Sequence, residues 1–367
     1  INRTSLFTSK IKYNKKVRDI YKVSKNNDKF INLIAPILVK NMPKTYIEDY
    51  KNILKFSNDL SWPKKPQKIF TSVSNFYDDV FKIWCAEIKR KNFAKLFFCC
   101  HGGGFQTNRF SNEKEYLLNT CDKILTWGKN KVKDKKIESF FNIKSSSKPF
   151  QIVNKNSLLS SNILLVQDMP RLYTSFLDSS FLHLSEYKHA VKIQSQFIQK
   201  LNTEKRKKVL VRLGSSTLSH SKNNLIEYEK KIWKNQIKDI RIETREKQAS
   251  ISVKNSYVVI ITQISSTLLL ECVSSNIPFL IFANLETQIV NDEFRKELYN
   301  LMKNNIMFED PEKISFFLNK KSQEELLIWW GSKKIQKIIR NFENNYARYN
   351  PNLLNNLKEI LISEHSS

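Results

Sequence analysis

The sequence predicts an α/β protein with two lobes, each built around a parallel sheet. Apolar runs of strand length alternate with stretches of helical spacing; the alternation stops in a charged segment near the middle of the chain and then restarts. The strands of the second half are apolar without interruption, as at 257–261, which is typical of a sheet covered on both faces. Composition agrees, because 41% of the 367 residues are hydrophobic and only 6 are Gly.

In the first half, residues 1 to about 30 are basic and polar, and we expect a loose or helical lead-in. Helical apolar spacing follows over 30–56, interrupted at Met42-Pro43. The elements predicted next are a strand at 68–73, a helix at 79–90, a strand at 94–100, a helix at 112–120 and a strand at 123–127. This order indicates a parallel sheet. Since the chain opens on Ile1 instead of Met, we expect it to be trimmed from something longer.

The charged, serine-containing segment 129–155 is predicted to separate the lobes. Beyond it we predict strands at 162–167, 208–213, 257–262 and 279–282, and helices at 186–201, 224–236 and 267–275. The tail over 323–361 is predicted to form one or two helices. We therefore assign a Rossmann-like N-terminal lobe to residues 1–150, a Rossmann-like C-terminal lobe to 151–325 and packing helices to 326–367.

The formal net charge of +27 raises the question of a polyanion partner. Most of the positive charge is lysine, it accompanies many Asn and Ile residues, and its runs are spread along the chain. Solvated faces, or attraction to anionic lipid and substrate, explain this pattern better than nucleic-acid binding, which stays open as the alternative.

The five cysteines are odd in number and form no pair of CxxC motifs, so we expect reduced thiols in a cytoplasmic protein. No signal-peptide pattern opens the chain. The apolar run over 257–273 is interrupted by polar residues and is not a membrane span.

The strongest candidate site is the segment 262–271, in which an apolar strand, a hydroxyl-rich turn and an apolar helix follow one another. Ligands of open α/β sheets lie beyond the carboxyl ends of the strands, and a helix start there suits a phosphate. Ser265, Ser266 and Thr267 would add hydroxyl donors, and Glu271, one turn later, could accept from sugar hydroxyls. The simpler alternative is a helix cap with a solvated Glu271.

A second candidate is His101 with Gly102, Gly103 and Gly104, directly after a strand. Three glycines let a ligand approach the backbone closely, and a histidine at the strand end could act as a base. The alternative is a structural histidine. The pattern is neither a Walker loop nor a dinucleotide fingerprint.

Weaker candidates are Arg212 at a strand end, Arg171 after Asp168-Met169-Pro170, and Glu113 in the first turn of the helix after the glycines. The arginines could bind phosphate or form structural ion pairs, and Glu113 could serve catalysis or the helix dipole. The pair Asp78-Asp79 fits a helix cap better than a metal site, so we predict no metal.

In order, these segments resemble a family of bacterial transferases encoded with surface-polysaccharide and O-antigen genes, first catalogued from leptospires. The matching pieces are 42–48, 81–86, 101–105, 122–128, 211–213, 265–271 with 276–278, Trp329-Trp330, Asn341-Phe342 and 346–348. Members usually extend further at the N-terminus, and they tend to have Tyr-Gly after the glycines, where this chain has Phe105-Gln106. The serine-rich turn with Glu271 is also similar to the nucleotide-binding element of GT-B transferases of the Kdo type and, more loosely, of CDP-glycerol polymerases.

The resemblance implies a GT-B-like fold, with C-terminal helices crossing between the lobes. It implies a donor nucleotide on Ser265, Ser266, Thr267 and Glu271 in the C-terminal lobe, an acceptor on the N-terminal lobe, and His101 near the reacting carbon. We expect a metal-independent glycosyltransferase without cofactor, transferring a CMP-linked acidic sugar to a polysaccharide or lipid-linked glycan for O-antigen or lipopolysaccharide synthesis.

In this scheme His101 or Glu113 takes the proton, while the helix start with Arg212 and Arg171 stabilises the leaving phosphate. We expect a cytoplasmic protein that can contact the inner face of the membrane. The alternatives are a CDP-polyol phosphotransferase of the teichoic-acid type and a non-catalytic polyanion-binding or scaffold protein.

Overall fold

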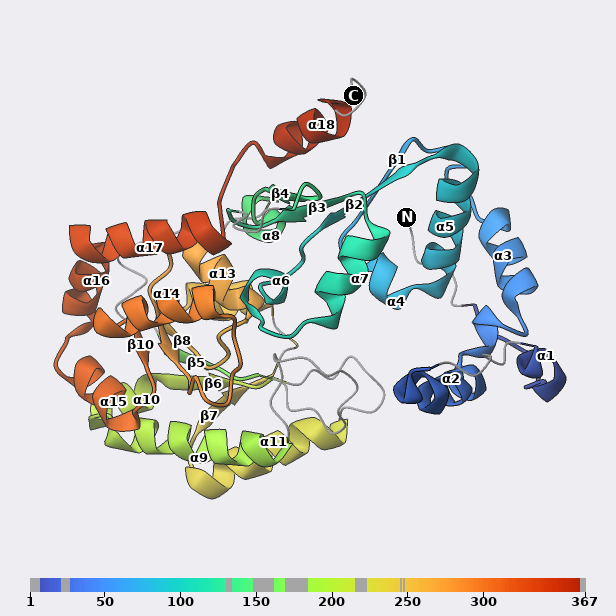
Figure 1. Ribbon diagram of the computed structural model, residues 1–367. Helices are drawn as coiled ribbons and strands as arrows, with labels where there is room; N and C mark the ends of the chain where they lie inside the picture. Colours follow the sequence, from blue (N-terminus) through green and yellow to red (C-terminus); the bar gives the residue numbers. More distant parts are fainter. Residues whose placement is uncertain are drawn as a thin grey trace. The chain divides into compact units, whose positions relative to one another are not determined.

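The computed structural model describes residues 7–20, 27–129, 134–147, 162–168, 184–214, 223–244, 246 and 248–363 (Figure 1). Its strands form two sheets, one of four strands in the order β1-β2-β3-β4 and one of six in the order β10-β9-β8-β5-β6-β7. Strands β1 and β2 pair in parallel, as do β3 and β4, and the pairs of the six-stranded sheet are all parallel. The predicted α/β class is thereby confirmed.

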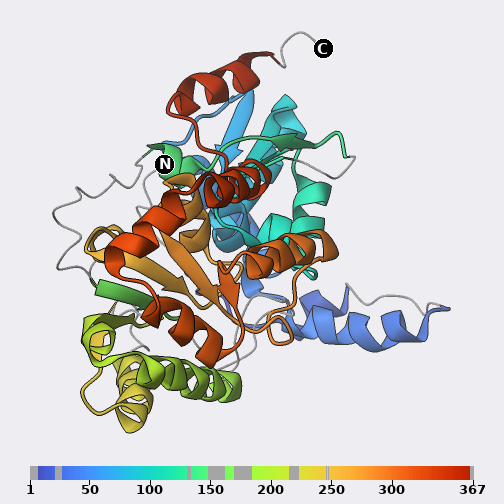
Figure 2. The same cartoon turned by 90° about the vertical axis from the view of Figure 1, so that its left-hand side faces the viewer.

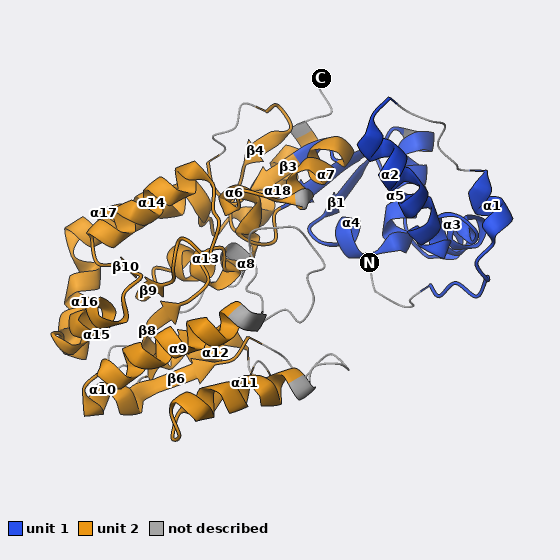
Figure 3. Cartoon of the chain, turned by 60° about the horizontal axis from the view of Figure 1, so that its bottom comes forward, with its two compact units in different colours: residues 1–99, 121–123 blue, residues 100–120, 124–367 orange. Residues whose placement is uncertain are grey.

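The chain divides into two compact units (Figure 3). Unit 1 comprises residues 1–99 and 121–123, and unit 2 comprises residues 100–120 and 124–367. The lobe limits predicted at 150 and 325 stay predictions.

Unit 1 is built on a βαβ arrangement preceded by helices. Its elements are α1 (Lys15–Asp19), α2 (Lys29–Asn41), the 3-10 turn η1 (Lys44–Tyr46), α3 (Tyr50–Asp59), β1 (Lys68–Thr71), α4 (Ser74–Tyr77), α5 (Asp79–Asn92) and β2 (Lys95–Cys99). Asp78 caps α5 by accepting from the Phe81 amide, as predicted, while Asp79 accepts from the Tyr46 hydroxyl. Val80 and Ile83 of α5 pack with Ile53 of α3 in the core of the unit.

The predicted helical stretch 30–56 is two helices, because α2 ends at Asn41, directly before Met42-Pro43. The next elements are α6 (Gly104–Thr107), α7 (Asn112–Thr120), β3 (Lys123–Thr126), β4 (Ile137–Ser139) and α8 (Ile143–Ser147). Strand β4 and helix α8 lie within the segment that the sequence indicated only as a charged separator.

Most of unit 2 is a Rossmann-like sheet with helices on both faces. Its elements are β5 (Asn162–Val166), α9 (Leu184–Lys200), α10 (Thr203–Lys208), β6 (Val209–Arg212), α11 (Asn223–Gln236), β7 (Arg241–Glu243), α12 (Ala249–Lys254), β8 (Ser256–Ile261), α13 (Thr267–Ser274), β9 (Phe279–Phe282), α14 (Asp292–Lys303), β10 (Met307–Phe308) and α15 (Pro311–Asn319). In order along the chain these strands take the sheet positions 3-2-1-4-5-6.

Alternation along the strands assigns the two faces of this sheet. Ile163 and Leu165 of β5 share a core with α9, α11 and α15, and so do Val258 and Ile260 of β8. The side chains between them are equally buried and face the other way, toward the layer of α13 and α14 (Figures 1 and 2). Burial on both faces explains the uninterrupted apolar strands.

Three helices end the chain, where the sequence predicted one or two: α16 (Gln323–Gly331), α17 (Lys333–Tyr346) and α18 (Leu353–Ser363). Ser332 separates α16 from α17 with an extended backbone, which local apolar spacing does not reveal. Trp330 is buried and donates to the Asn276 side chain, so the tryptophan pair is core packing. Within the described ranges, no helix combines the length and apolarity that crossing a bilayer requires.

Candidate active site

The strand order creates a switch point between β5 and β8 in unit 2. These strands are neighbours, but β5 leads to β6 on one side while β8 leads to β9 on the other. In sheets of this order, the crevice beyond the carboxyl ends of these two strands is the usual ligand site. Helix α13 begins six residues after β8 ends, so its N-terminus lies at this edge.

Side-chain hydrogen bonds fix the turn between β8 and α13. Gln288 spans it, because its Oε1 accepts from the Ile264 amide at 2.7 Å and its Nε2 donates to the Thr262 carbonyl at 2.7 Å. Ser266 is the N-cap of α13, and its hydroxyl accepts from the Leu268 amide at 3.2 Å. Ser265, Ser266 and Thr267 are half-buried, so the start of the helix is ordered without being covered.

The glycine loop, residues 101–104, lies against this helix start within unit 2. A Cβ atom on Gly102 would stand 2.9 Å from Thr267 Oγ1, and one on Gly103 would stand 3.1 Å from Leu270 Cδ1 and 3.2 Å from the Ser265 carbonyl oxygen. The two segments that the sequence singled out are therefore in contact, although about 160 residues separate them. The close approach at these two glycines is to α13, whereas the sequence argument had assigned it to a ligand.

The residues around the glycines are held by short local bonds. Thr107 Oγ1 donates to the Gly103 carbonyl at 2.9 Å, which closes the turn of α6. His101 is half-buried and directly precedes Gly102, which places it beside the first turn of α13. Glu113 is half-buried in the first turn of α7.

Glu271 lies one turn into α13 and is partly buried, with 17% of its side chain exposed. Burial raises the pKa of its carboxyl group, and Lys144, whose Nζ lies 3.6 Å from Oε1, counteracts that shift. A partly desolvated carboxylate one turn after the helix start can accept hydrogen bonds from hydroxyl groups of a ligand.

A buried clamp holds the far end of α13, and the sequence analysis missed it. Asn142 is fully buried, and its Nδ2 donates to Ser274 Oγ at 3.0 Å. The Ser274 hydroxyl donates to the Ala347 carbonyl at 2.6 Å. The clamp joins residues distant in sequence, so it leaves no local signal beyond the types Asn and Ser.

Arg212 ends β6 at the same carboxyl edge and is 4% exposed. Its Nη1 donates to Glu243 Oε1 at 2.9 Å and lies 3.3 Å from Ser252 Oγ. The structure therefore shows the ion pair that was the alternative to phosphate binding. The other predicted arginine, Arg171, lies outside the described residues.

A family model described as “LIC12162 family transferase” matches residues 1–361. The chain belongs to this family. Against curated proteins, the sequence finds no match.

Among solved structures, this LIC12162 family transferase is similar to Anabaena Alr3699/HepE in complex with UDP and glucose. That structure has 9% sequence identity, a TM-score of 0.50, and coverage of 89% of this chain and 85% of the other. A second HepE structure, in complex with UDP-glucose, has 10% identity, a TM-score of 0.50 and the same coverage. A glycosyltransferase from Rickettsia africae ESF-5 has 14% identity and a TM-score of 0.45, and covers 94% of this chain and 84% of its own. The fold of the LIC12162 family transferase is thus GT-B-like.

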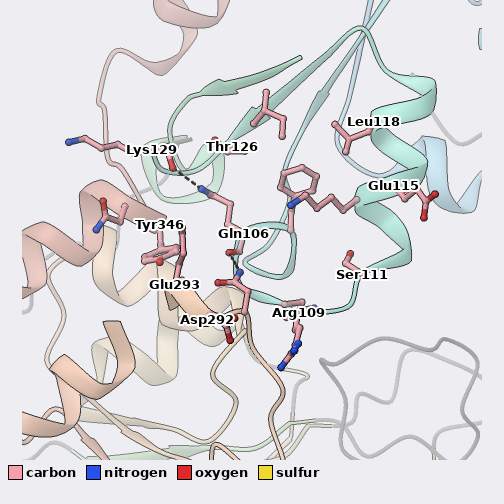
Figure 4. A pocket seen from close by; sticks show the side chains of 16 residues that line it. Gln106, Arg109, Ser111, Glu115, Leu118, Thr126, Lys129, Asp292, Glu293 and Tyr346 are labelled. Carbon is pink, nitrogen blue, oxygen red and sulfur yellow. Dashed lines mark hydrogen bonds between the residues drawn. The ribbon is translucent and has the colours of Figure 1, made fainter. Parts of the chain in front are cut away.

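A pocket of 530 Å³ lies within unit 2, starting at the residue after the glycine loop (Figure 4). Amide, charged and aromatic side chains line it: Phe105, Gln106, Asn108, Arg109, Ser111, Lys114, Glu115, Leu118, Thr126, Lys129, Ile137, Asn291, Asp292, Glu293, Asn345 and Tyr346. Asn291 Nδ2 donates to the Gln106 carbonyl at 2.7 Å, which ties α14 to the wall formed by α6. In the part of the chain that the structure describes, no group of three or more His, Cys, Asp and Glu has a geometry for binding a metal.

Proposed function

We propose that this LIC12162 family transferase is a glycosyltransferase that binds a nucleotide-activated sugar at the start of α13. One observation carries the proposal: the glycine loop with His101 meets the capped N-terminus of α13 at the switch point of the sheet. A helix N-terminus presents backbone amides and a partial positive charge, which suits a nucleotide phosphate. The HepE structures contain UDP with glucose and UDP-glucose, which supports this donor class.

In this proposal the hydroxyls of Ser265, Ser266 and Thr267 bind the donor phosphates, and Glu271 accepts hydrogen bonds from the ribose. Arg212, on the second strand from β8 in the sheet, contributes positive charge at the carboxyl edge alongside its bond to Glu243. Arg171 is retained as a further phosphate ligand. A CMP-linked acidic sugar is the favoured donor, by the resemblance described above.

The acceptor is proposed to bind in the pocket beside the glycine loop. Amides such as Asn291, carboxylates such as Glu293 and the ring of Tyr346 are the kinds of group that bind sugar hydroxyls and sugar faces. The acceptor is proposed to be a surface-polysaccharide or lipid-linked glycan in O-antigen or lipopolysaccharide synthesis. We also propose a cytoplasmic location with contact to an anionic membrane surface.

The chemistry follows from this placement. An acceptor hydroxyl oxygen forms a bond to the anomeric carbon of the donor while the bond from that carbon to the phosphate oxygen breaks. His101 or Glu113 takes the hydroxyl proton. The negative charge left on the nucleotide phosphate is stabilised by the start of α13 and by Arg212, and the scheme uses neither metal nor cofactor.

The decisive experiment measures the melting temperature of the protein with CMP, CDP, UDP, GDP and dTDP. A nucleotide at 100 times its dissociation constant stabilises by about 2.7 kcal/mol. Thr267→Val, which removes one hydroxyl at constant shape, is expected to reduce that stabilisation. Its matched control is Thr120→Val at the end of α7, where the Thr120 hydroxyl donates to the Tyr116 carbonyl. Equal nucleotide responses in both variants would place the phosphate elsewhere.

Replacing His101 with Ala separates binding from catalysis. We expect nucleotide stabilisation to persist and sugar transfer to fall by about 10²–10⁴, as for the loss of a general base. If transfer is unchanged, His101 has no catalytic role. Turnover of a CDP-polyol in place of a CMP-sugar would identify the phosphotransferase alternative, and salt-dependent retention on DNA without any nucleotide response would identify the polyanion-binding one.

A further inference from the structure

Helix α2 of unit 1 is largely apolar, and most of its residues are exposed. All of residues 29–41 are described, and none of them is buried. Phe30 is 67% exposed, Leu33 63% and Leu38 57%. A surface helix normally buries its apolar stripe against the rest of the protein, and among the described residues this helix lacks that contact.

The exposure is concentrated in this part of the molecule. Among the described residues, 22 large hydrophobic side chains are exposed, and ten of them fall within the first 50 positions of the chain: Ile11, Tyr13, Ile20, Phe30, Ile31, Leu33, Ile37, Leu38, Met42 and Tyr50. Single exposed apolar residues are ordinary, but five of these ten lie on the one helix α2, and such a concentration marks an interaction surface.

The large apolar residues of α2 that are exposed share one broad side of the helix. At about 100° per residue, Phe30, Leu33 and Ile37 fall within about 60° of one another, and Ile31 and Leu38 extend the apolar side to about 160°. Lys29 and Lys40 lie at one edge of this side. That arrangement is the one in which a helix lies flat in a membrane interface, with its apolar side down and its lysines toward the headgroups.

The positive charge of the first 50 residues favours a membrane with anionic lipids. The first 50 residues contain eleven Lys and Arg against four Asp and Glu. Lys10, Lys12, Lys15 and Lys16, which flank or belong to α1, are all exposed. Each lysine near a negatively charged leaflet adds to the attraction.

A buried ion pair holds α2 in place from one end. The guanidinium of Arg18 in α1 donates to the carbonyls of Val39, Lys40 and Met42 at 2.8 to 2.9 Å, and it pairs with both carboxylate oxygens of Glu48. These contacts fix the last turn of α2 to α1, which lies beside it (Figure 1). The apolar side is therefore presented by a positioned helix.

We propose that α2, with the lysines of α1, docks this protein onto an anionic lipid bilayer. The inference rests on the membrane contact proposed above and names the element that makes it, and it does not depend on glycosyl transfer. The bilayer is chosen over a protein partner because the apolar side is bordered by positive charge, which complements anionic headgroups.

The test is co-sedimentation of the full chain with vesicles of phosphatidylglycerol and phosphatidylcholine. The wild type is expected to bind these vesicles, to bind pure phosphatidylcholine vesicles more weakly, and to lose binding as salt rises. The double variant Leu33→Ser, Ile37→Ser is expected to bind at least about tenfold more weakly. The control is Ile328→Ser, Leu354→Ser, which removes two comparably exposed side chains, 67% and 76% exposed, from α16 and α18.

Circular dichroism and the nucleotide-induced thermal shift are measured on all variants, so that a folding defect or a failure of the donor proposal is seen separately. The proposal is overturned if the wild type does not bind anionic vesicles, or if the α2 variant and the control bind alike. It is also overturned if the α2 variant changes only the oligomeric state, since the face would then join copies of this chain.

Discussion

Gly128 is the position at which a single added methyl group should be least tolerated. A Cβ there would stand 2.0 Å from the Asn345 carbonyl oxygen and 2.4 Å from the Tyr346 nitrogen, where ordinary contacts are 3.4–4 Å. Both neighbours are backbone atoms, so the two segments would have to separate by more than 1 Å. None of the described glycines has a positive φ, so the whole effect of Gly128→Ala comes from this contact.

The expected loss of unfolding free energy is estimated from the contacts that separating these two segments would break. The two segments exchange backbone hydrogen bonds, from the Lys129 amide to Asn344 at 3.0 Å and from the Arg348 amide to Trp127 at 2.7 Å. Overpacking costs about 1–3 kcal/mol and each hydrogen bond about 1 kcal/mol. We expect Gly128→Ala to lower the free energy of unfolding by about 3–5 kcal/mol, which is exceptional for one methyl group.

Urea denaturation followed by circular dichroism measures this change. Gly331→Ala is the matched control, because no described atom lies within 4 Å of a Cβ at that position, the last residue of α16. It should be neutral or stabilising by up to about 1 kcal/mol. If Gly128→Ala stays within about 1 kcal/mol of the wild type, the close approach of the two backbones is not as described.

Four further predictions concern the site and its support. Ser266→Ala removes the cap of α13 and should reduce the free energy of unfolding by about 1 kcal/mol in urea denaturation; no change would mean that the cap contributes nothing. Glu271→Gln should raise the melting temperature at neutral pH, because burial raises the pKa of this carboxyl group and so destabilises its charged form. The same variant should bind nucleotide more weakly. If it binds nucleotide as tightly as the wild type, Glu271 is not part of the site. Asn142→Ala should cost about 2–4 kcal/mol in the same urea assay by leaving buried partners unsatisfied, and a loss below 1 kcal/mol would contradict the clamp. The hydrogen bonds from Arg18 lower the pKa of Glu48 to about 2, so the stability that this carboxylate contributes is present above its ordinary value of 4.5 and is lost as pH falls from there toward 2; Glu48→Gln should flatten that part of the melting temperature–pH curve.

The elements of the site could be predicted from local sequence because each is a local pattern. The strand β8, its hydroxyl-rich turn and the helix α13 have bounds within about one residue of those expected, since an apolar run, a capping serine and helical spacing follow one another there. The expected interruption of the stretch 30–56 at Met42-Pro43 is where α2 ends. The C-terminal tail, in contrast, was divided into too few helices, because the extended backbone at Ser332 interrupts spacing that otherwise stays apolar.

What joins these elements could not be predicted, because it depends on contacts between distant residues. Nothing near Arg212 in the sequence indicates that Glu243 pairs with it; that follows only from the adjacency of β6 and β7 in the sheet. For the glycine loop, a local pattern could not reveal that α13 and the turn before it lie against Gly102 and Gly103.

The clamp on α13 couples the two ends of this eight-residue helix. Its first turn is where a phosphate would bind, while Ser274 at its other end is hydrogen-bonded to Asn142, 132 residues earlier, and to Ala347, 73 residues later. Because so short a helix unfolds as one unit, a ligand that reduces local unfolding of its first turn also reduces local unfolding of its last turn. Slower amide hydrogen–deuterium exchange at Asn142 and Ala347 would then report binding at the first turn of α13, although both residues contact the opposite end of that helix.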